Sequence, residues 1–191
     1  SRNPLIGDRA EYPQSRERIL TDDELKAIWN ALSDTPFSIA VRLMILTGQR
    51  RTEVQHIEIH GDVAYIDGQH TKNKKNHRFP VGRHTQIYFK PFSFNGWSKA
   101  KKRLDEISGT ANWTLHDLRR TFASNHAKLG TPIHVVEKML NHVSGSLAGV
   151  AGIYNRHTYM DEMREACNRY EEWLISVVAQ ARSSRKRSGA S

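Results

Sequence analysis

The stretch "QHIEIHGDVAYIDGQHTKNKKNHRFPV", residues 55–81, decides the fold, because the hydrophobic pattern changes within it from helical spacing to alternation. "HIEIH" alternates apolar and polar residues, "VAYID" is rich in strand-forming residues, and "HRFPV" follows the polar turn "TKNKKN". Short runs of this kind, separated by turn residues, are typical of antiparallel strands. The stretch therefore predicts a small three-stranded antiparallel sheet.

Helical patterns precede this stretch. Thr21 and Glu24 stand at the spacing of a capping box, which predicts a helix start. The core face of that helix is expected to hold Leu25, Ile28, Trp29 and Leu32. The next run, "FSIAVRLMILTG", is apolar nearly all round and predicts a buried helix that ends at Gly48.

Helical patterns return after residue 91. They comprise "WSKAKKRLDEI", a helix starting in "TLHDLRR", "TPIHVVEKML" with Thr131 as cap and Pro132 at the first helical position, and residues 159–181. The last helix is expected to bury a stripe of Met160, Met163, Cys167, Tyr170, Leu174 and Val177. The predicted fold class is thus α+β, mostly α-helical with a small three-stranded antiparallel sheet.

Length and composition predict one domain. A chain of 191 residues can bury one full core, so we expect a domain over residues 21–181, a leader or interdomain linker at 1–20 and a disordered basic tail at 182–191. Because the chain starts at Ser1, we expect the full protein to continue on that side. No apolar run is long enough to predict a membrane span or a secretory signal. The single cysteine, Cys167, excludes an internal disulfide and fits a reducing cytoplasm.

The chain is strongly basic, with 29 Lys and Arg against 20 Asp and Glu and a net charge of +9. A sequence pI of about 9.8 favours a polyanionic partner such as nucleic acid, because phosphates paired with Lys and Arg release condensed counterions. Charge that only keeps the protein soluble is the alternative interpretation.

In "TLHDLRR", Thr114 and Asp117 predict a helix that begins at Leu115 and places His116 in its first turn. Backbone amides at a helix start favour an anion, and Arg119 lies one turn on, so both side chains are expected to line a cleft. The alternative is a capping histidine beside solvated arginines.

Two further stretches hold candidate site residues. In "LTGQRRTEV", Arg50 follows Gly48 into a turn where Glu53 can brace its guanidinium, with Arg51 as the neighbouring competitor. Lys72 begins the basic turn "TKNKKN", which alone is an ordinary turn composition.

Taken in order, "TGQRRTEV", "TKN", "HDLRRT", "MLNH" and "GIYNRH" resemble the catalytic motifs of the tyrosine recombinase (phage integrase) family, closest to prophage and genomic-island integrases. The resemblance spans residues 21 to about 175. It implies a site-specific recombinase that cleaves and rejoins DNA through a covalent 3′-phosphotyrosine, without cofactor or metal. The implied roles are phosphate clamping by Arg50 and Arg119, proton transfer by His116, general acid chemistry by Lys72, phosphate binding by His142 and nucleophilic attack by Tyr154. Further expected DNA contacts are Arg120 and Arg156.

The chemistry of these residue types agrees with the implied roles. Two permanently charged, bidentate guanidiniums suit the charge that grows on a phosphodiester under attack. A tyrosine, with an ordinary pKa near 10, needs a cationic site and a proton acceptor to attack at neutral pH. The leaving 5′ oxygen needs a proton, which a positioned lysine can give.

The sequence departs from the family pattern in two places. Asn141 stands where a glycine commonly precedes the second histidine, and the segment between His142 and Tyr154 is longer than usual. Tyr159 is therefore the alternative nucleophile. Tyr154 is preferred because it follows an apolar segment and precedes "NRH".

A non-catalytic DNA-binding module is one alternative, either a recombinase fold that has lost activity or a helix-turn-helix formed by residues 116–140. The recognition helix of the latter would begin with Pro132 and Ile133 and carry few polar groups. A metal-dependent nuclease is disfavoured because Glu58 sits in an alternating strand pattern. A type IB topoisomerase uses similar chemistry and is kept as an alternative interpretation. The expected partners are double-stranded DNA, an N-terminal DNA-binding domain absent from this chain and other recombinase protomers, in a cytoplasmic, nucleoid-associated protein without membrane contact.

Overall fold

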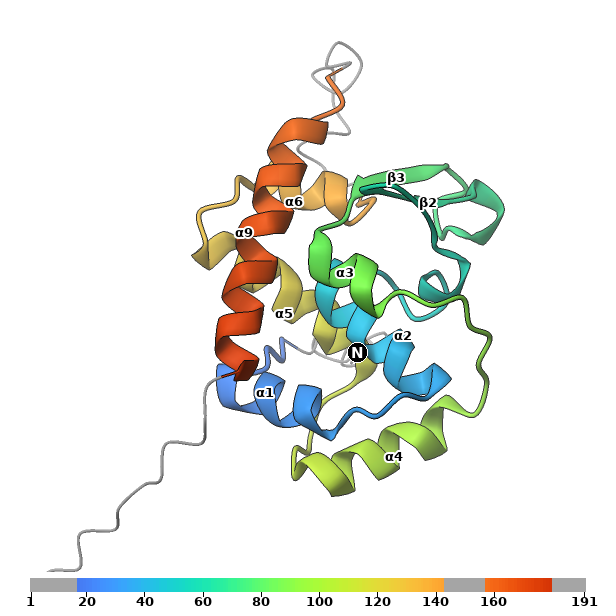
Figure 1. Cartoon of the computed structure of the whole chain (residues 1–191), viewed down its shortest axis with the longest axis vertical. Coiled ribbons are helices and arrows are strands. Elements are labelled where there is room, and N and C mark those ends of the chain that lie inside the picture. Colours follow the sequence, from blue (N-terminus) through green and yellow to red (C-terminus); the bar gives the residue numbers. More distant parts are fainter. Residues whose placement is uncertain (1–16, 143–156, 180–191) are drawn as a thin grey trace, which may run out of the picture.

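The computed structural model describes residues 17–142 and 157–179, and the fold within these ranges is mostly helical (Figure 1). The helices are α1 (Asp22–Ala31), α2 (Pro36–Thr47), α3 (Arg83–Tyr88), α4 (Trp97–Ser108), α5 (Leu115–Lys128), α6 (Ile133–Met139) and α9 (Met160–Ala179), with short 3₁₀ turns η1 (Val54–His56) and η2 (Gly68–His70). The strands are β1 (Glu58–His60), β2 (Val63–Ile66) and β3 (His77–Pro80). The expected tail at 182–191 and most of the expected leader lie outside the described residues.

The three strands form one antiparallel sheet in the order β1-β2-β3, which confirms the predicted fold class. Ile59 pairs with Ala64, and Ala64 pairs in turn with Phe79. Ala64 and Phe79 are buried, whereas Val63, Tyr65 and Arg78, which face the other way, are more exposed. The sheet lies beside the helices, at the upper right of the view, and α3 follows β3 (Figure 1).

The helix starts and stops follow local chemistry. The amide of Glu24 donates to Thr21 Oγ1 at 3.2 Å, and the amide of Thr21 donates to Glu24 Oε2 at 2.9 Å, so the capping box of α1 is present. Helix α2 ends at Gly48, whose φ of 66° is in the left-handed region. A Cβ there would lie 2.5 Å from the Phe122 ring and 2.7 Å from Leu140, so Gly48 also allows α2 to meet α5 and the end of α6.

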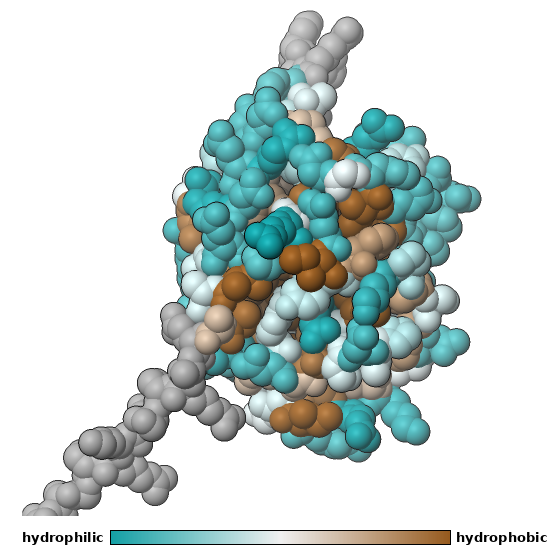
Figure 2. Space-filling model, in the orientation of Figure 1, coloured by the Kyte–Doolittle hydropathy of each residue, from teal (hydrophilic) through white to brown (hydrophobic). Residues whose placement is uncertain are grey.

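The core forms around α2, which is buried on nearly every side, as its uniformly apolar sequence predicts. Helix α9 closes the core with Tyr170, whose hydroxyl donates to the carbonyl of Ile45 at 2.8 Å. On the face shown in Figure 2, hydrophilic residues dominate, and hydrophobic ones reach the surface mainly between α9 and α3. Within the described ranges, no helix has the length and apolar character to cross a bilayer.

Two local predictions are wrong, and one helix was not predicted. Helix α6 begins at Ile133 with Pro132 as its N-cap, because Thr131 instead contacts His126 Nδ1 through its hydroxyl. On α9 the buried position is Val178, with Val177 only half-buried. Helix α3 has no counterpart among the predicted elements.

Helix α3 forms because a distant carboxylate caps it. Glu171 of α9 is buried and accepts the amides of Gly82, His84 and Thr85 at 3.1, 2.7 and 3.2 Å. It also accepts the Thr85 hydroxyl. A charged acceptor for the free amides of a helix start compensates the short length of α3.

Candidate active site

Glu53 joins two loops that are separate in sequence. Arg50 follows the end of α2 and donates through Nη1 to Glu53 Oε1 at 3.0 Å, which is the brace expected from the sequence. The same carboxylate oxygen accepts the backbone amide of Lys72 at 3.0 Å. Because the side chain of Glu53 is fully buried, this oxygen holds the Arg50 turn and the Lys72 loop together away from water.

Arg119 lies at the centre of the site and is 7% exposed. Its Nη1 donates to the carbonyl of Gly48 at 3.0 Å, and its Nη2 donates to the carbonyl of Leu140 at 2.6 Å. Burial, and then repulsion from Arg50, lower the pKa of Arg119 to about 10, so it remains charged at neutral pH. Two carbonyls therefore fix the orientation of a guanidinium whose charge no described acid neutralises directly.

The C-terminal end of α6 supplies the carbonyls that organise this region. The last carbonyls of a helix have no partner within it, and here three successive ones, of Met139, Leu140 and Asn141, accept side chains from elsewhere in the fold. The donors are Gln49 and His77 to Met139, Arg119 to Leu140, and Asn73 to Asn141. The end of α6 thus ties together the Arg50 turn, the sheet, α5 and the Lys72 loop.

His116 is exposed in the first turn of α5, which begins at Leu115 as predicted. Partial burial, followed by the charges of Arg120 and Arg119, lowers its pKa below the ordinary value, against an opposing effect of Asp117. The imidazole is therefore neutral at neutral pH and can accept a proton. Arg120 donates to Asp117 at 2.7 Å, so part of its charge is neutralised within the helix.

Lys72 and His142 are both exposed and come from different elements. Lys72 lies in the loop between β2 and β3, and only its backbone is anchored, by Glu53. His142 follows α6, where its amide donates to the carbonyl of Glu137 at 2.9 Å. Its position next to Asn141 places it beside the carbonyls that hold Arg119 and Asn73.

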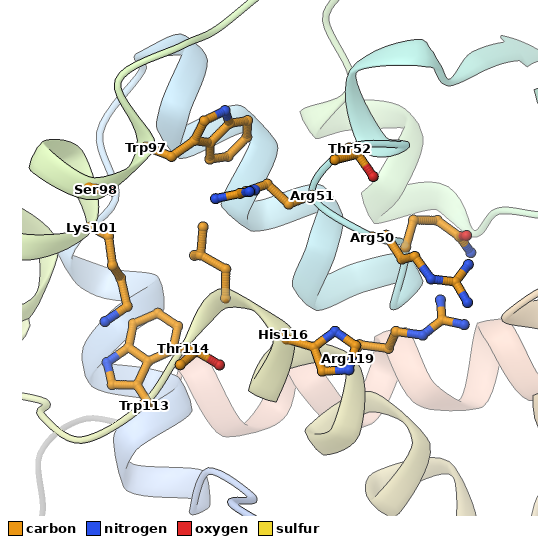
Figure 3. A pocket seen from close by; sticks show the side chains of 12 residues that line it. Arg50, Arg51, Thr52, Trp97, Ser98, Lys101, Trp113, Thr114, His116 and Arg119 are labelled. Atoms are coloured by element: carbon orange, nitrogen blue, oxygen red, sulfur yellow. The ribbon is translucent and has the colours of Figure 1, made fainter. Parts of the chain in front are cut away.

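A cleft of about 460 Å³ contains Arg50, Arg119 and His116 (Figure 3). The guanidiniums of Arg50 and Arg119 point to the same region, at one end of the lining. At the other end, Arg51 lies 5.7 Å from the ring centroid of Trp97, and Lys101 Nζ lies 3.9 Å from that of Trp113. Sequence reasoning missed the lining residues Gln49, Trp97, Lys101 and Trp113, although Trp97 and Lys101 are four residues apart and so share a helix face.

The nucleophile is not located by the described residues, because Tyr154 and Arg156 lie outside them. The alternative, Tyr159, packs its ring against His134 at 5.0 Å between centroids. His134 is at the N-terminal end of α6, about 10 Å along the helix from Asn141 at 1.5 Å per residue. Tyr159 thus packs at the N-terminal end of α6, whereas Arg119 is held at its C-terminal end. Among the described residues, no three His, Cys, Asp or Glu side chains form a group suited to a metal ion.

Two comparisons with known proteins found similarities. Residues 89–161 match the model of the phage integrase family. Among solved structures, the chain is similar to the XerH site-specific recombinase bound to its difH substrate in a pre-cleavage complex, with a TM-score of 0.50 and 14% identity. The similarity covers 66% of this chain and 47% of the XerH chain, so this chain matches about half the length of that protein. No curated protein sequence matches. The similarity to XerH shows the fold, and the match to the phage integrase family model covers residues 89–161.

Proposed function

We propose that this chain is the catalytic domain of a site-specific recombinase that cleaves and rejoins double-stranded DNA through a covalent 3′-phosphotyrosine. The observation that carries the proposal is the convergence of Arg50, Arg119 and His116 on one cleft, with Lys72 tied to the same cluster through Glu53. These residues come from three segments of the chain: the turn after α2, the loop between β2 and β3, and α5. A purely structural role does not explain why exposed and buried cations gather at one place.

The arginines act on the scissile phosphate. In attack by a tyrosine, negative charge grows on the non-bridging oxygens, and donors already aimed at them need no reorganisation. Arg119 is held by two carbonyls and Arg50 by Glu53, so both guanidiniums are preorganised before DNA binds. His142 joins them as a further phosphate ligand.

The proton transfers balance within the same set of residues. The hydroxyl of Tyr154 attacks phosphorus and gives its proton to the neutral imidazole of His116. The bond from phosphorus to the 5′ oxygen breaks, and Lys72 donates a proton to that oxygen. The products are a 3′-phosphotyrosine and a free 5′ hydroxyl, and the reverse reaction rejoins a strand. The phosphotyrosine conserves the bond energy, so the scheme uses neither ATP nor a metal ion.

The biological role follows as part of the same proposal. Integration or excision of a mobile element requires two DNA partners, and we expect further protomers and an N-terminal DNA-binding domain to complete the clamp. Arg120 and Arg156 are proposed as additional phosphate contacts. The protein would act on the nucleoid in the cytoplasm.

A nicked suicide substrate tests the proposal. After cleavage, the short fragment that carries the free 5′ hydroxyl diffuses away and cannot be rejoined. The covalent protein–DNA adduct therefore accumulates and is resolved on a denaturing gel. Wild type should form the adduct in EDTA, Tyr154→Phe should not, and Tyr159→Phe should retain it. DNA binding without any adduct would instead support a non-catalytic DNA-binding module, and relaxation of supercoiled DNA without strand exchange would support a topoisomerase.

A further inference from the structure

The side chain of Asn73 uses its full hydrogen-bonding capacity at the tip of the loop between β2 and β3. Its Nδ2 donates to the Oδ1 and the carbonyl of Asn141 at 2.9 and 3.3 Å. Its Oδ1 accepts Asn141 Nδ2, the amide of Lys75 and the hydroxyl of Thr71 at 3.2, 3.1 and 3.2 Å. One amide group therefore closes its own loop and links that loop to the end of α6.

Asn141 has a backbone conformation suited to this link. Its φ of 49° lies in the left-handed region, which asparagine tolerates better than most residues other than glycine. A glycine would hold the same backbone, but it would lack the amide that pairs with Asn73. The pair is half-buried, so water competes only partly for its hydrogen bonds.

The pair lies next to two site residues, since Lys72 precedes Asn73 and His142 follows Asn141. On one side, the backbone of Lys72 is held by Glu53, which also holds Arg50. On the other side, Asn141 follows Leu140, whose carbonyl holds Arg119. The two asparagines therefore close a ring of contacts that runs from Arg50 through the Lys72 loop to Arg119.

We propose that the pair of Asn73 and Asn141 positions the ammonium group of Lys72 over the leaving oxygen, as a pair of positioning residues for the proposed DNA cleavage. This inference rests on the proposed function. Lys72 is exposed, and its ammonium group ends a flexible four-carbon side chain. The contacts that anchor its backbone therefore decide how often the ammonium lies within reach of the 5′ oxygen. Loss of the pair leaves the carboxylate of Glu53 as the anchor of the Lys72 backbone, and the proton donor then samples more positions.

A substrate with sulfur in place of the bridging 5′ oxygen distinguishes positioning of the proton donor from a role in folding or phosphate binding. A thiol has a pKa near 8.5 and leaves as a thiolate, whereas an alcohol close to water, with a pKa of about 16, needs a proton donor. The test compares cleavage of the oxygen and sulfur suicide substrates by four proteins: wild type, Asn141→Gly, Asn73→Ala and Lys72→Ala. All four are made in the full-length protein. Asn112→Gly is a matched control, because Asn112 also has a positive φ of 59°.

For Asn141→Gly and Asn73→Ala, the maximal rate on the oxygen substrate should fall about 10- to 100-fold, with little change in the DNA concentration needed for half-maximal rate. On the sulfur substrate both variants, and Lys72→Ala, should return to within about threefold of wild type. The double variant should be no slower than the worse single variant, because both remove one contact. Asn112→Gly should match wild type on both substrates.

Equal losses on the two substrates would overturn the inference, because they would indicate a role in folding or phosphate binding. Wild-type rates for both asparagine variants on the oxygen substrate would overturn it as well. Failure of the sulfur substrate to rescue Lys72→Ala would remove Lys72 as the proton donor and the inference with it. If wild type forms no adduct on either substrate, the proposed function itself fails, which is a separate and distinguishable result.

Discussion

The carboxylate of Glu53 accepts the backbone amide of Lys72 at 3.0 Å across 19 residues of sequence, and the same oxygen accepts Arg50 at 3.0 Å. A fully buried carboxylate with these two donors couples the proposed phosphate clamp to the proposed proton donor. Displacement of either loop is therefore expected to affect the other.

The first prediction concerns this coupling. Glu53→Gln keeps an acceptor oxygen but removes the charge beside Arg50, so single-turnover cleavage should fall about 10- to 100-fold, while Glu53→Ala should fall further. The free energy of unfolding should drop by about 2 kcal/mol in the alanine variant, as expected for hydrogen bonds to a charged group. Stopped-time adduct assays and urea unfolding measure the two effects. Wild-type cleavage by Glu53→Ala would show that the bridge has no catalytic consequence.

The second prediction compares arginines. Arg119→Lys cannot span the carbonyls of Gly48 and Leu140, so the adduct rate should fall by about 10²-fold or more. Arg120→Lys should stay within about threefold of wild type, because Arg120 is one-third exposed and paired with Asp117. The same gel assay measures both. Equal losses would mean that the buried geometry of Arg119 is not what matters.

The third prediction concerns the aromatic end of the cleft. Arg51 stacks on Trp97 and forms no ion pair with an acid of the described residues, so its charge is available for a DNA phosphate. Arg51→Ala should weaken DNA binding and reduce the slope of log affinity against log salt by about 1. The cleavage rate at saturating DNA should change little. Fluorescence anisotropy from 50 to 200 mM salt checks the slope, and an unchanged slope would place Arg51 outside the DNA interface.

The fourth prediction concerns the cap of α3. Glu171→Ala leaves three backbone amides without their carboxylate, so the free energy of unfolding should fall by about 3 kcal/mol. Gly82→Ala should also destabilise, because its Cβ would overlap the Glu171 carboxylate. Glu172→Ala is the matched control, being exposed on the same helix. Thermal and urea unfolding measure all three, and a loss in Glu172→Ala equal to that in Glu171→Ala would contradict the cap.

The fifth prediction concerns pH. Burial lowers the pKa of His77 to about 4 and that of His126 to about 3, from an ordinary 6.5. The unfolded chain therefore binds more protons than the folded one below pH 6.5, and stability falls as pH drops from 6.5 toward 4. Each histidine should contribute a loss of about 2 kcal/mol between pH 6.5 and 5. In His126→Phe the phenylalanine ring can still stack on Tyr170. The free energy of unfolding of this variant, measured in urea across this range, should therefore change less steeply with pH than that of wild type. An unchanged slope would mean that His126 does not titrate on unfolding.

Local signals predicted a large part of the fold. The cap of α1, the end of α2 at Gly48 and the brace between Arg50 and Glu53 involve residues no more than four positions apart, so their spacing reveals them. The alternation in residues 55–81 likewise predicted the sheet. Arg119 and His116 were predicted to share a cleft because a helical turn separates them, and the structure places both in its lining.

The missed features depend on contacts between distant residues. Helix α3 is capped by Glu171, which is 87 residues beyond His84. The sequence of residues 83–88 does not indicate that partner. The link between Asn73 and Asn141 spans 68 residues. Asparagine is common in turns, so Asn73 alone does not indicate a distant partner. Composition likewise gave no sign that Arg119 would be buried among carbonyls. The assignment of Tyr154 over Tyr159 remains a prediction.

The most direct test of the central claim is mass spectrometric mapping of the covalent adduct formed on a suicide substrate in EDTA. Proteolysis of the trapped complex should yield a single DNA-linked peptide in which Tyr154 carries the 3′ phosphate. The same treatment of Tyr154→Phe should yield none. Absence of any adduct, attachment at a residue other than tyrosine, or an adduct that forms only with added divalent metal would contradict the claim.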